Sequence, residues 1–138
     1  MLGEELIQLV RKIQQQRCER QHIELKKAAE GPPVGLYSTL SSFSNQHSGG
    51  IIIFGVDEGQ GFAVSGVYDA QDLQKKVSEQ ANQMEPTVRL LFTVATIEEK
   101  VVVSAEIAEC DISLKPCFYK GAGRLLAVMF AWASVTRR

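Results

Sequence analysis

The sequence has few of the residues from which metal sites and disulfide frameworks are built. Its 138 residues include three cysteines and two histidines. The cysteines are odd in number and widely spaced, which argues against a secreted disulfide framework and favours a reducing, cytoplasmic compartment. Neither a C-x-x-C nor an H-E-x-x-H spacing occurs, so the sequence offers no zinc site.

The sequence also has no long apolar run. Its most apolar stretch, residues 125–135, is well short of the roughly 20 residues that a membrane-spanning helix needs. Glu4 and Glu5 stand where an export signal would carry positive charge and then apolar residues. We therefore expect neither a membrane partner nor export.

No excess of one charge sign marks a binding partner. The formal net charge is −1, with 45% apolar and 22% charged residues, as in an ordinary globular protein of one domain. Nucleic-acid binding needs a local basic surface and not a basic total, so this balance leaves it open. A P-loop and a dinucleotide-binding fingerprint are both missing from the sequence.

Apolar periodicity and turn residues predict the elements of the fold. Leu6, Val10 and Ile13 are spaced as on one helix face, and the β-branched run 51–56 is typical of a central strand buried on both sides. We expect helices at 3–17, 34–45 and 69–83, strands at 22–26, 51–56, 62–67, 88–97 and 100–107, and a short strand within 115–123. This order predicts an α+β fold, with a mixed, mostly antiparallel sheet and helices packed against it.

Three segments, in this order, resemble the Schlafen AlbA-like domain. They are Glu19-x4-Glu24-Leu25-Lys26, then Ser42-Phe43-Ser44-Asn45 followed by Gly49-Gly50, then Ile53-Phe54-Gly55-Val56-Asp57. In that family the segments typically read E-x4-E-F-K, S-A-F-A-N-T-x-G-G and I-x-G-V-D-D-x-G. The resemblance extends to a proline-tyrosine-glycine segment at 115–121.

The resemblance divides the chain into three parts. Residues 1–18 form an N-terminal amphipathic helix, residues 19–124 the Schlafen AlbA-like domain, and residues 125–138 an atypical tail. The loop at Gln46-His47-Ser48 is one residue longer than the family pattern. The tail is a larger departure, because the family's Y-x-R-x-G strand should begin there.

Our hypothesis for the tail is a shifted reading frame. Starting at the third base of the Leu125 codon, suitable codon choices can be read as A-G-S-Y-V-R-V-G-E, which restores the family's tyrosine, arginine and glycine. We therefore expect a frame-shifted or otherwise aberrant end, and a natural protein that continues with the missing strand.

Three carboxylates are candidates for a catalytic metal site. Glu19 and Glu24 bracket the entrance of one strand, and Asp57 follows the central strand. If these strands are neighbours, the three side chains converge and can hold Mg²⁺ or Mn²⁺, which would activate water. In the Schlafen proteins that cut RNA, a similar Glu, Glu, Asp set is the active site. The alternative is that Glu24 pairs with a nearby cation, Glu19 caps the strand and Asp57 is a turn residue.

A second candidate site is a basic surface for nucleic acid. Four cations lie close together in the sequence and are suited to phosphate contacts, namely Arg17, Arg20, Lys26 and Lys27. Small polar residues beside paired glycines suit close approach of a phosphate backbone, namely Asn45, Ser48, Gly49 and Gly50. A solvated charged edge and a simple helix end explain the two groups equally well.

The resemblance implies a domain that binds nucleic acid, either DNA or RNA. Such domains occur in bacterial transcriptional regulators and RecG-type helicase-related proteins. No cofactor is expected for such a domain, and we expect no enzymatic activity of it alone. The first alternative is a metal-dependent endoribonuclease that uses Glu19, Glu24 and Asp57 with Mg²⁺ or Mn²⁺. The second is an interaction or homo-oligomerisation domain, in which an open sheet edge pairs with another copy.

Overall fold

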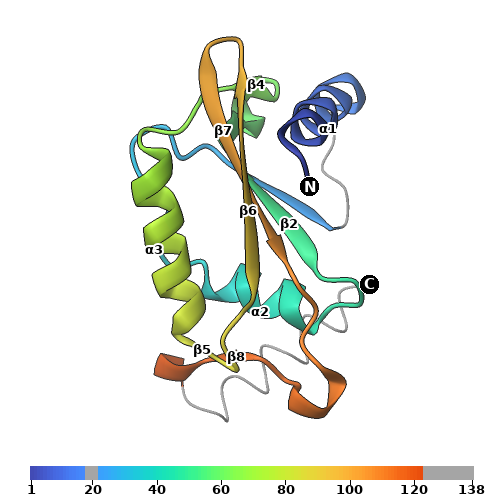
Figure 1. Cartoon of the computed structure of the whole chain (residues 1–138), viewed down its shortest axis with the longest axis vertical. Coiled ribbons are helices and arrows are strands. Elements are labelled where there is room, and N and C mark those ends of the chain that lie inside the picture. The colour runs from blue at the N-terminus through green and yellow to red at the C-terminus, as the bar shows by residue number, and fades with distance from the viewer. Residues whose placement is uncertain (18–21, 123–138) are drawn as a thin grey trace.

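A computed structural model describes residues 1–17 and 22–122 of the chain (Figure 1). The helices are α1 (Gly3–Gln16), α2 (Tyr37–Asn45) and α3 (Ala70–Asn82). The strands are β1 (Ile23–Lys26), β2 (Gly50–Phe54), β3 (Val56–Asp57), β4 (Ala63–Val64), β5 (Met84–Glu85), β6 (Leu90–Ile97), β7 (Lys100–Ile107) and β8 (Phe118–Tyr119). This is the α+β fold that the sequence predicts.

The main sheet has four strands in the order β1-β2-β7-β6. β1 runs parallel to β2, and the other two neighbouring pairs are antiparallel. Two small sheets, β3-β4 and β5-β8, flank it. In the main sheet β1 and β6 are therefore the edge strands.

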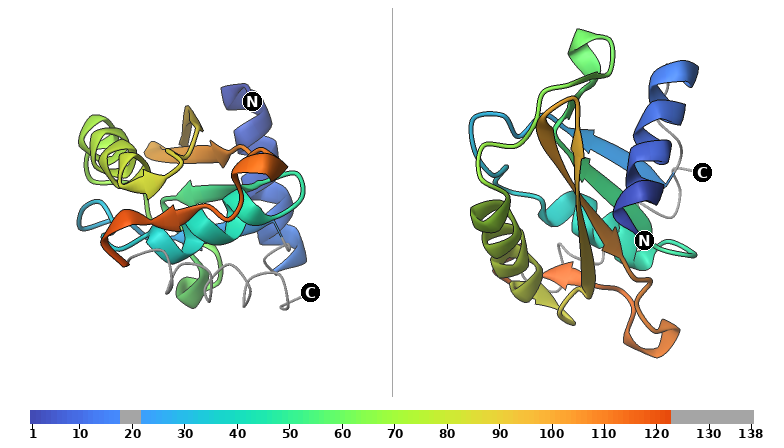
Figure 2. Two further views of the ribbon diagram at one scale, coloured as in Figure 1. Left: turned by 90° about the horizontal axis from the view of Figure 1, so that it is seen from below. Right: turned by 45° about the horizontal axis from the view of Figure 1, so that its top comes forward.

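Helices pack against both faces of the sheet, and each face has its own core (Figures 1 and 2). Ile52 and Phe54 of β2 point into the core that contains α2 and α3, whereas Ile53 points into the core beneath α1. The central strand is thus buried on both sides, as its continuous β-branched sequence predicts. α1 contributes Leu6, Val10 and Ile13 to its core.

Helix α3 and the hairpin that follows match the prediction. Asp69 caps α3 by accepting hydrogen bonds from the N–H groups of Gln71 (3.0 Å) and Asp72 (3.1 Å). β6 and β7 pair along their whole length around a turn at Glu98 and Glu99. Both turn residues have positive φ, 52° and 66°, as in the tight two-residue hairpins whose twist suits a sheet.

The first predicted hairpin differs from the structure. The central strand stops at Phe54, because Gly55 (φ +107°) takes the chain out of the sheet. The Gly55 N–H donates to Lys26 O (2.8 Å), and its carbonyl accepts from the N–H of Ser65 (2.8 Å). The returning strand, expected over 62–67, is only Ala63–Val64 and pairs with β3 instead of β2.

Helix α2 begins three residues later than predicted. Gln80 of α3 accepts a hydrogen bond from Leu36 N (2.7 Å) and donates one to Pro33 O (2.9 Å). These bonds hold the proline segment in a non-helical conformation until Tyr37. A partner 44 residues away in sequence therefore sets the start of the helix.

Two expectations concern residues outside the described ranges. Residues 18–21, which include Glu19 and Arg20, are not described, and neither is the tail 123–138, where we predict an aberrant end. Among the described residues, no helix is long and apolar enough to cross a membrane.

Candidate nucleic-acid interface

Strand β1 carries one of the four predicted basic residues, Lys26, on the edge of the sheet. Ile23 and Leu25 point into the core beneath α1, so Glu24 and Lys26 point to the opposite face. The Lys26 Nζ lies 3.3 Å from Glu24 Oε1, and both side chains are about one-third exposed. The other carboxylate oxygen of Glu24 accepts a hydrogen bond from Thr39 Oγ1 (2.9 Å). Glu24 therefore has a cation and a hydroxyl as partners.

Lys27 follows at the end of this strand and is exposed. Its carbonyl accepts a hydrogen bond from Ser65 Oγ (2.9 Å), which fixes its backbone to the β4 loop. No acidic group within the described ranges lies within ion-pair distance of its ammonium. Lys27 is thus a cation on a fixed backbone that is available to a phosphate.

Arg17 ends helix α1 in the left-handed conformation (φ 52°), and its N–H donates to Ile13 O (2.8 Å). It is exposed. Arg20 lies outside the described residues. Of the other predicted cations, Lys26 and Lys27 are consecutive in the chain at the end of β1, where Lys26 pairs with Glu24.

The two described carboxylates of the predicted metal site each have a structural partner. β1 and β2 are neighbours, which is the condition for convergence. Asp57, however, lies on β3, beyond the kink at Gly55, and its Oδ1 accepts the Gly59 N–H (3.0 Å) of a tight turn. Within residues 1–17 and 22–122 no group of three His, Cys, Asp or Glu side chains is placed to hold a metal ion. Glu19, the third predicted ligand, lies outside this part.

The paired glycines after α2 are required by packing. Gly49 has φ +68°, and a Cβ on it would run into the carbonyl oxygen of Ile107. A Cβ on Gly50 would run into the ring of Phe43. Close approach of the protein's own β7 and α2 therefore explains both glycines.

Asn45 is buried and its amide holds the chain near β8. Its Oδ1 accepts the Cys117 N–H (2.8 Å), and its Nδ2 donates to Cys117 O (3.0 Å) and Ser41 O (2.9 Å). Ser41 Oγ donates to the same Cys117 carbonyl (2.9 Å). All of these partners are protein groups, so the amide of Asn45 faces the interior.

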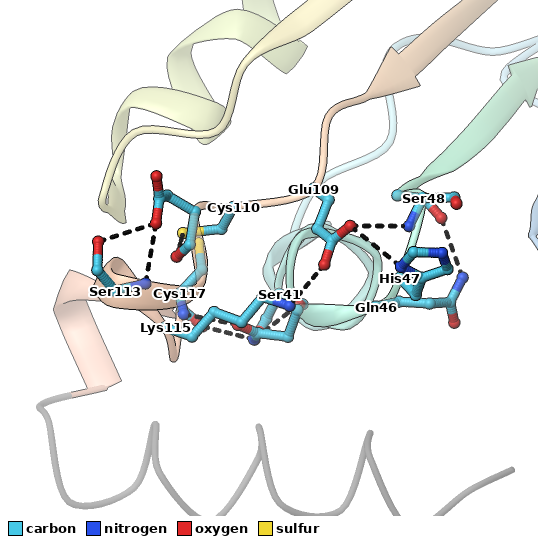
Figure 3. Close-up of polar contacts among 12 residues, drawn as sticks. Ser41, Gln46, His47, Ser48, Glu109, Cys110, Ser113, Lys115 and Cys117 are labelled. Atoms are coloured by element: carbon cyan, nitrogen blue, oxygen red, sulfur yellow. Dashed lines mark hydrogen bonds and ion pairs between the residues drawn. The ribbon is translucent and has the colours of Figure 1, made fainter.

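Ser48 is hydrogen-bonded to a carboxylate, that of Glu109, which sequence reasoning missed (Figure 3). Its N–H donates to Glu109 Oε1 (3.0 Å), and Lys115 Nζ donates to Glu109 Oε2 (2.8 Å). The Nδ1 of the exposed His47 is 3.6 Å from Glu109 Oε1. The hydrogen bond from Lys115, followed by that from Ser48, holds the pKa of the Glu109 carboxyl below its ordinary value. No local sequence signal identifies Glu109, because it is 61 residues from Ser48.

The fold has relatives of known structure. The N-terminal domain of a RecG-related helicase protein from Nitrosomonas europaea, solved by NMR, matches with a TM-score of 0.67 and 22% identity, over 85% of this chain and 81% of that one. A Corynebacterium diphtheriae protein, solved by crystallography, matches with a TM-score of 0.52 and 16% identity, over 86% of this chain and 24% of that one. At these identities the likeness is one of fold, and the chain spans about a quarter of the second protein.

No curated protein matches the chain significantly. The model of the family described as Schlafen, AlbA_2 matches residues 19–123, which is most of the chain. The match begins at Glu19 and takes in the three motif segments and the proline-tyrosine-glycine segment. The chain therefore belongs to the Schlafen AlbA_2 family.

Proposed function

We propose that this domain binds nucleic acid through the phosphate backbone, and that the edge of β1 is its contact surface. The observation that carries the proposal is Lys27, which is exposed directly after the edge strand β1 and has no acidic partner in the described ranges. An edge strand offers its side chains to a long, stiff ligand with no neighbouring strand in the way. Arg17 and Arg20 are proposed to extend the same surface.

Such contacts supply affinity without reading bases. Ammonium groups on phosphate release counterions and position the nucleic acid, but they carry little sequence information. We therefore propose a domain that tethers a larger protein to DNA or RNA, as suits the helicase-related name of the Nitrosomonas protein. Other domains of the larger protein would then select the sequence of the DNA or RNA.

The turn at Ser48–Gly50 is less suited to phosphate than its sequence suggests. The Glu109 carboxylate already accepts the Ser48 N–H, and it carries negative charge where a phosphate would approach. Asn45 is occupied by Cys117. We therefore place the main contact at Lys26 and Lys27, with Ser48, Gly49 and Gly50 at most peripheral.

A lysine-pair comparison tests the proposal. Lys26→Ala with Lys27→Ala should weaken binding to labelled DNA and RNA about equally across sequences, and should lower the slope of log K against log salt by about 2. Anisotropy titrations at several salt concentrations measure both quantities. The matched control is Lys75→Ala with Lys76→Ala, an adjacent and exposed pair on α3. If both double variants weaken binding equally, or if neither weakens it, the assignment of the contact to the β1 edge is wrong.

A metal-dependent endoribonuclease is the second candidate. It is favoured by the parallel pairing of β1 with β2, which brings the strand of Glu24 beside the strand that leads to Asp57. If it is correct, Mn²⁺ should support cleavage of structured RNA, and Glu24→Gln should abolish cleavage while binding persists. Thr39→Ala is the matched control, because it removes a hydrogen bond to Glu24 but no carboxylate. Absence of cleavage with either Mg²⁺ or Mn²⁺ would rule this candidate out.

A further inference from the structure

The second edge of the sheet, β6, lacks the features that usually protect an edge strand. Its eight residues, Leu90 to Ile97, include no charged residue, proline or glycine. β1, by contrast, is four residues long, and two of them are charged. Long, uncharged edges pair readily with other strands, and natural proteins normally block them with lysine, proline or bulges.

No other strand in the described ranges pairs with the outer side of β6, although the start of α1 approaches it near Val94. β6 pairs only with β7. In Figure 1, β6 lies in front of β7 and β2, with α1 and α3 to either side. Leu91 is 58% exposed and Val94 is 46% exposed. Gly3 lies close to the Val94 carbonyl, and Leu2 beside it is 70% exposed, so apolar surface gathers at this edge.

The hairpin determines which backbone groups point outward. In a two-residue hairpin the closing pair, here Ile97 and Lys100, is hydrogen-bonded, and the pairs then alternate along the ladder. The hydrogen bond from Ala108 N to Arg89 O (3.2 Å) fits this alternation at the far end. The N–H and C=O groups that point away from β7 therefore belong to every second residue, namely Leu90, Phe92, Val94 and Thr96.

We propose that a second copy of this chain occupies this edge, by antiparallel pairing of β6 with β6 about a two-fold axis at Val94. That register places outward-facing residues opposite one another and extends the ladder across the axis. It also places the Arg89 of each copy opposite the Glu99 of the other. Because β6 itself is uncharged, no like charges meet along the strands.

The charges at the strand ends make the edge self-complementary. Arg89 is exposed and has no ion pair in the described part of the chain, and Glu99 is exposed at the hairpin turn. Two-fold symmetry forms the Arg89–Glu99 pair twice, once at each end. Opposite charges facing one another across strands stabilise the pairing, whereas like charges destabilise it. This charge complementarity favours a second copy over an unrelated strand.

The oligomeric state and a charge swap test the proposal. Sedimentation equilibrium should show the wild-type chain as a reversible dimer. Val94→Lys should give a monomer, because the two-fold axis brings the two introduced ammonium groups opposite each other. Arg89→Glu should weaken the dimer by about tenfold or more, because both Arg89–Glu99 ion pairs are lost and replaced by pairs of like charge. The double variant Arg89→Glu with Glu99→Arg should restore it.

The controls separate this edge from other causes of association. Lys75→Glu on α3 changes the charge as Arg89→Glu does, but away from the edge, and should leave the dimer unchanged. Circular dichroism checks that the Val94→Lys monomer is folded. A monomeric wild-type chain would overturn the proposal. So would a dimer that survives Val94→Lys, or a charge swap that fails to restore what Arg89→Glu removes.

Discussion

Asn45 and Cys117 form a two-way clamp across 72 residues of sequence, in which the asparagine side chain accepts the cysteine N–H at 2.8 Å and donates to its carbonyl at 3.0 Å. The clamp fixes the segment that leads into β8 against the last turn of α2. An amide side chain can satisfy a peptide group in this way because it carries both a donor and an acceptor. The asparagine of the Ser42-Phe43-Ser44-Asn45 segment thus has a structural role.

Replacing Asn45 by Ala should therefore destabilise the domain. The substitution leaves the buried Cys117 N–H without a partner, which costs on the order of 2 kcal/mol. Urea unfolding followed by circular dichroism measures the loss. Ser42→Ala, on the same helix and in none of the hydrogen bonds described, should change stability by less than about 0.5 kcal/mol. Equal effects of the two substitutions would mean that the clamp contributes nothing.

Cys117 should resist alkylation in the folded protein. Burial is the main cause that raises the pKa of its thiol to about 11, and its side chain is 1% exposed. At about pH 8 only about one in a thousand of these thiols is ionised. Mass spectrometry after iodoacetamide treatment should show Cys110, which is only partly buried, modified before Cys117. Modification of both at one rate would show that the β8 segment opens freely.

The same raised pKa predicts a stability change at high pH. The folded state favours the neutral thiol. The contribution of this thiol to the free energy of unfolding is therefore complete below the ordinary pKa of 9.0 and is lost as the pH rises toward 11. Cys117→Ser should remove this dependence.

The Glu109 carboxylate should stabilise the Ser48 turn only while it is charged. The pKa of this carboxyl is lowered by the hydrogen bond from Lys115 and then by that from Ser48. Its contribution to the free energy of unfolding is therefore complete above the ordinary pKa of 4.5. It is lost as the pH falls through the lowered value. Glu109→Gln should therefore be less stable than wild type at about pH 6, and equal to it at about pH 2. A difference that does not change with pH would mean that the charge is irrelevant.

The long elements of the fold were predictable because each satisfies local and tertiary demands together. Leu73, Val77 and Ala81 are spaced for a helix and are buried in one, and Asp69, a residue type that favours helix N-caps, caps it. The β6–β7 hairpin follows from two alternating strands around two turn residues. These signals are local, so a sequence contains them.

The contacts of the candidate site depend on partners that are distant in sequence. Glu109 is hydrogen-bonded to Ser48, which is 61 residues away, and Cys117 is hydrogen-bonded to Asn45, which is 72 residues away. The proline segment stays out of α2 because Gln80 binds it. Periodicity and motif spacing contain none of these contacts. The sequence therefore locates the motif glycines. It does not show why Gly49 must be glycine, which is that the carbonyl oxygen of Ile107 fills the space of a Cβ.

The two proposals together predict how binding depends on the length of DNA. In the proposed dimer the sheet has eight strands, with β1, and Lys27 directly after it, at both outer edges. Seven spacings of about 4.8 Å place these edges about 34 Å apart. This distance is close to the roughly 34 Å of one turn of B-DNA, so a duplex of more than one turn is long enough to reach from one edge to the other.

Binding through two edges raises affinity without a new contact, because the second contact becomes intramolecular. A duplex of about 20 base pairs should therefore bind the wild-type chain on the order of a hundredfold more tightly than one of about 8 base pairs. Val94→Lys should remove that difference and leave binding of the short duplex unchanged, whereas Lys27→Ala should weaken both. If Val94→Lys gives a folded monomer that still binds the long duplex as wild type does, the dimer makes no use of its two edges. If the short duplex also loses affinity, β6 itself contacts nucleic acid, and the proposed interface lies at the wrong edge of the sheet.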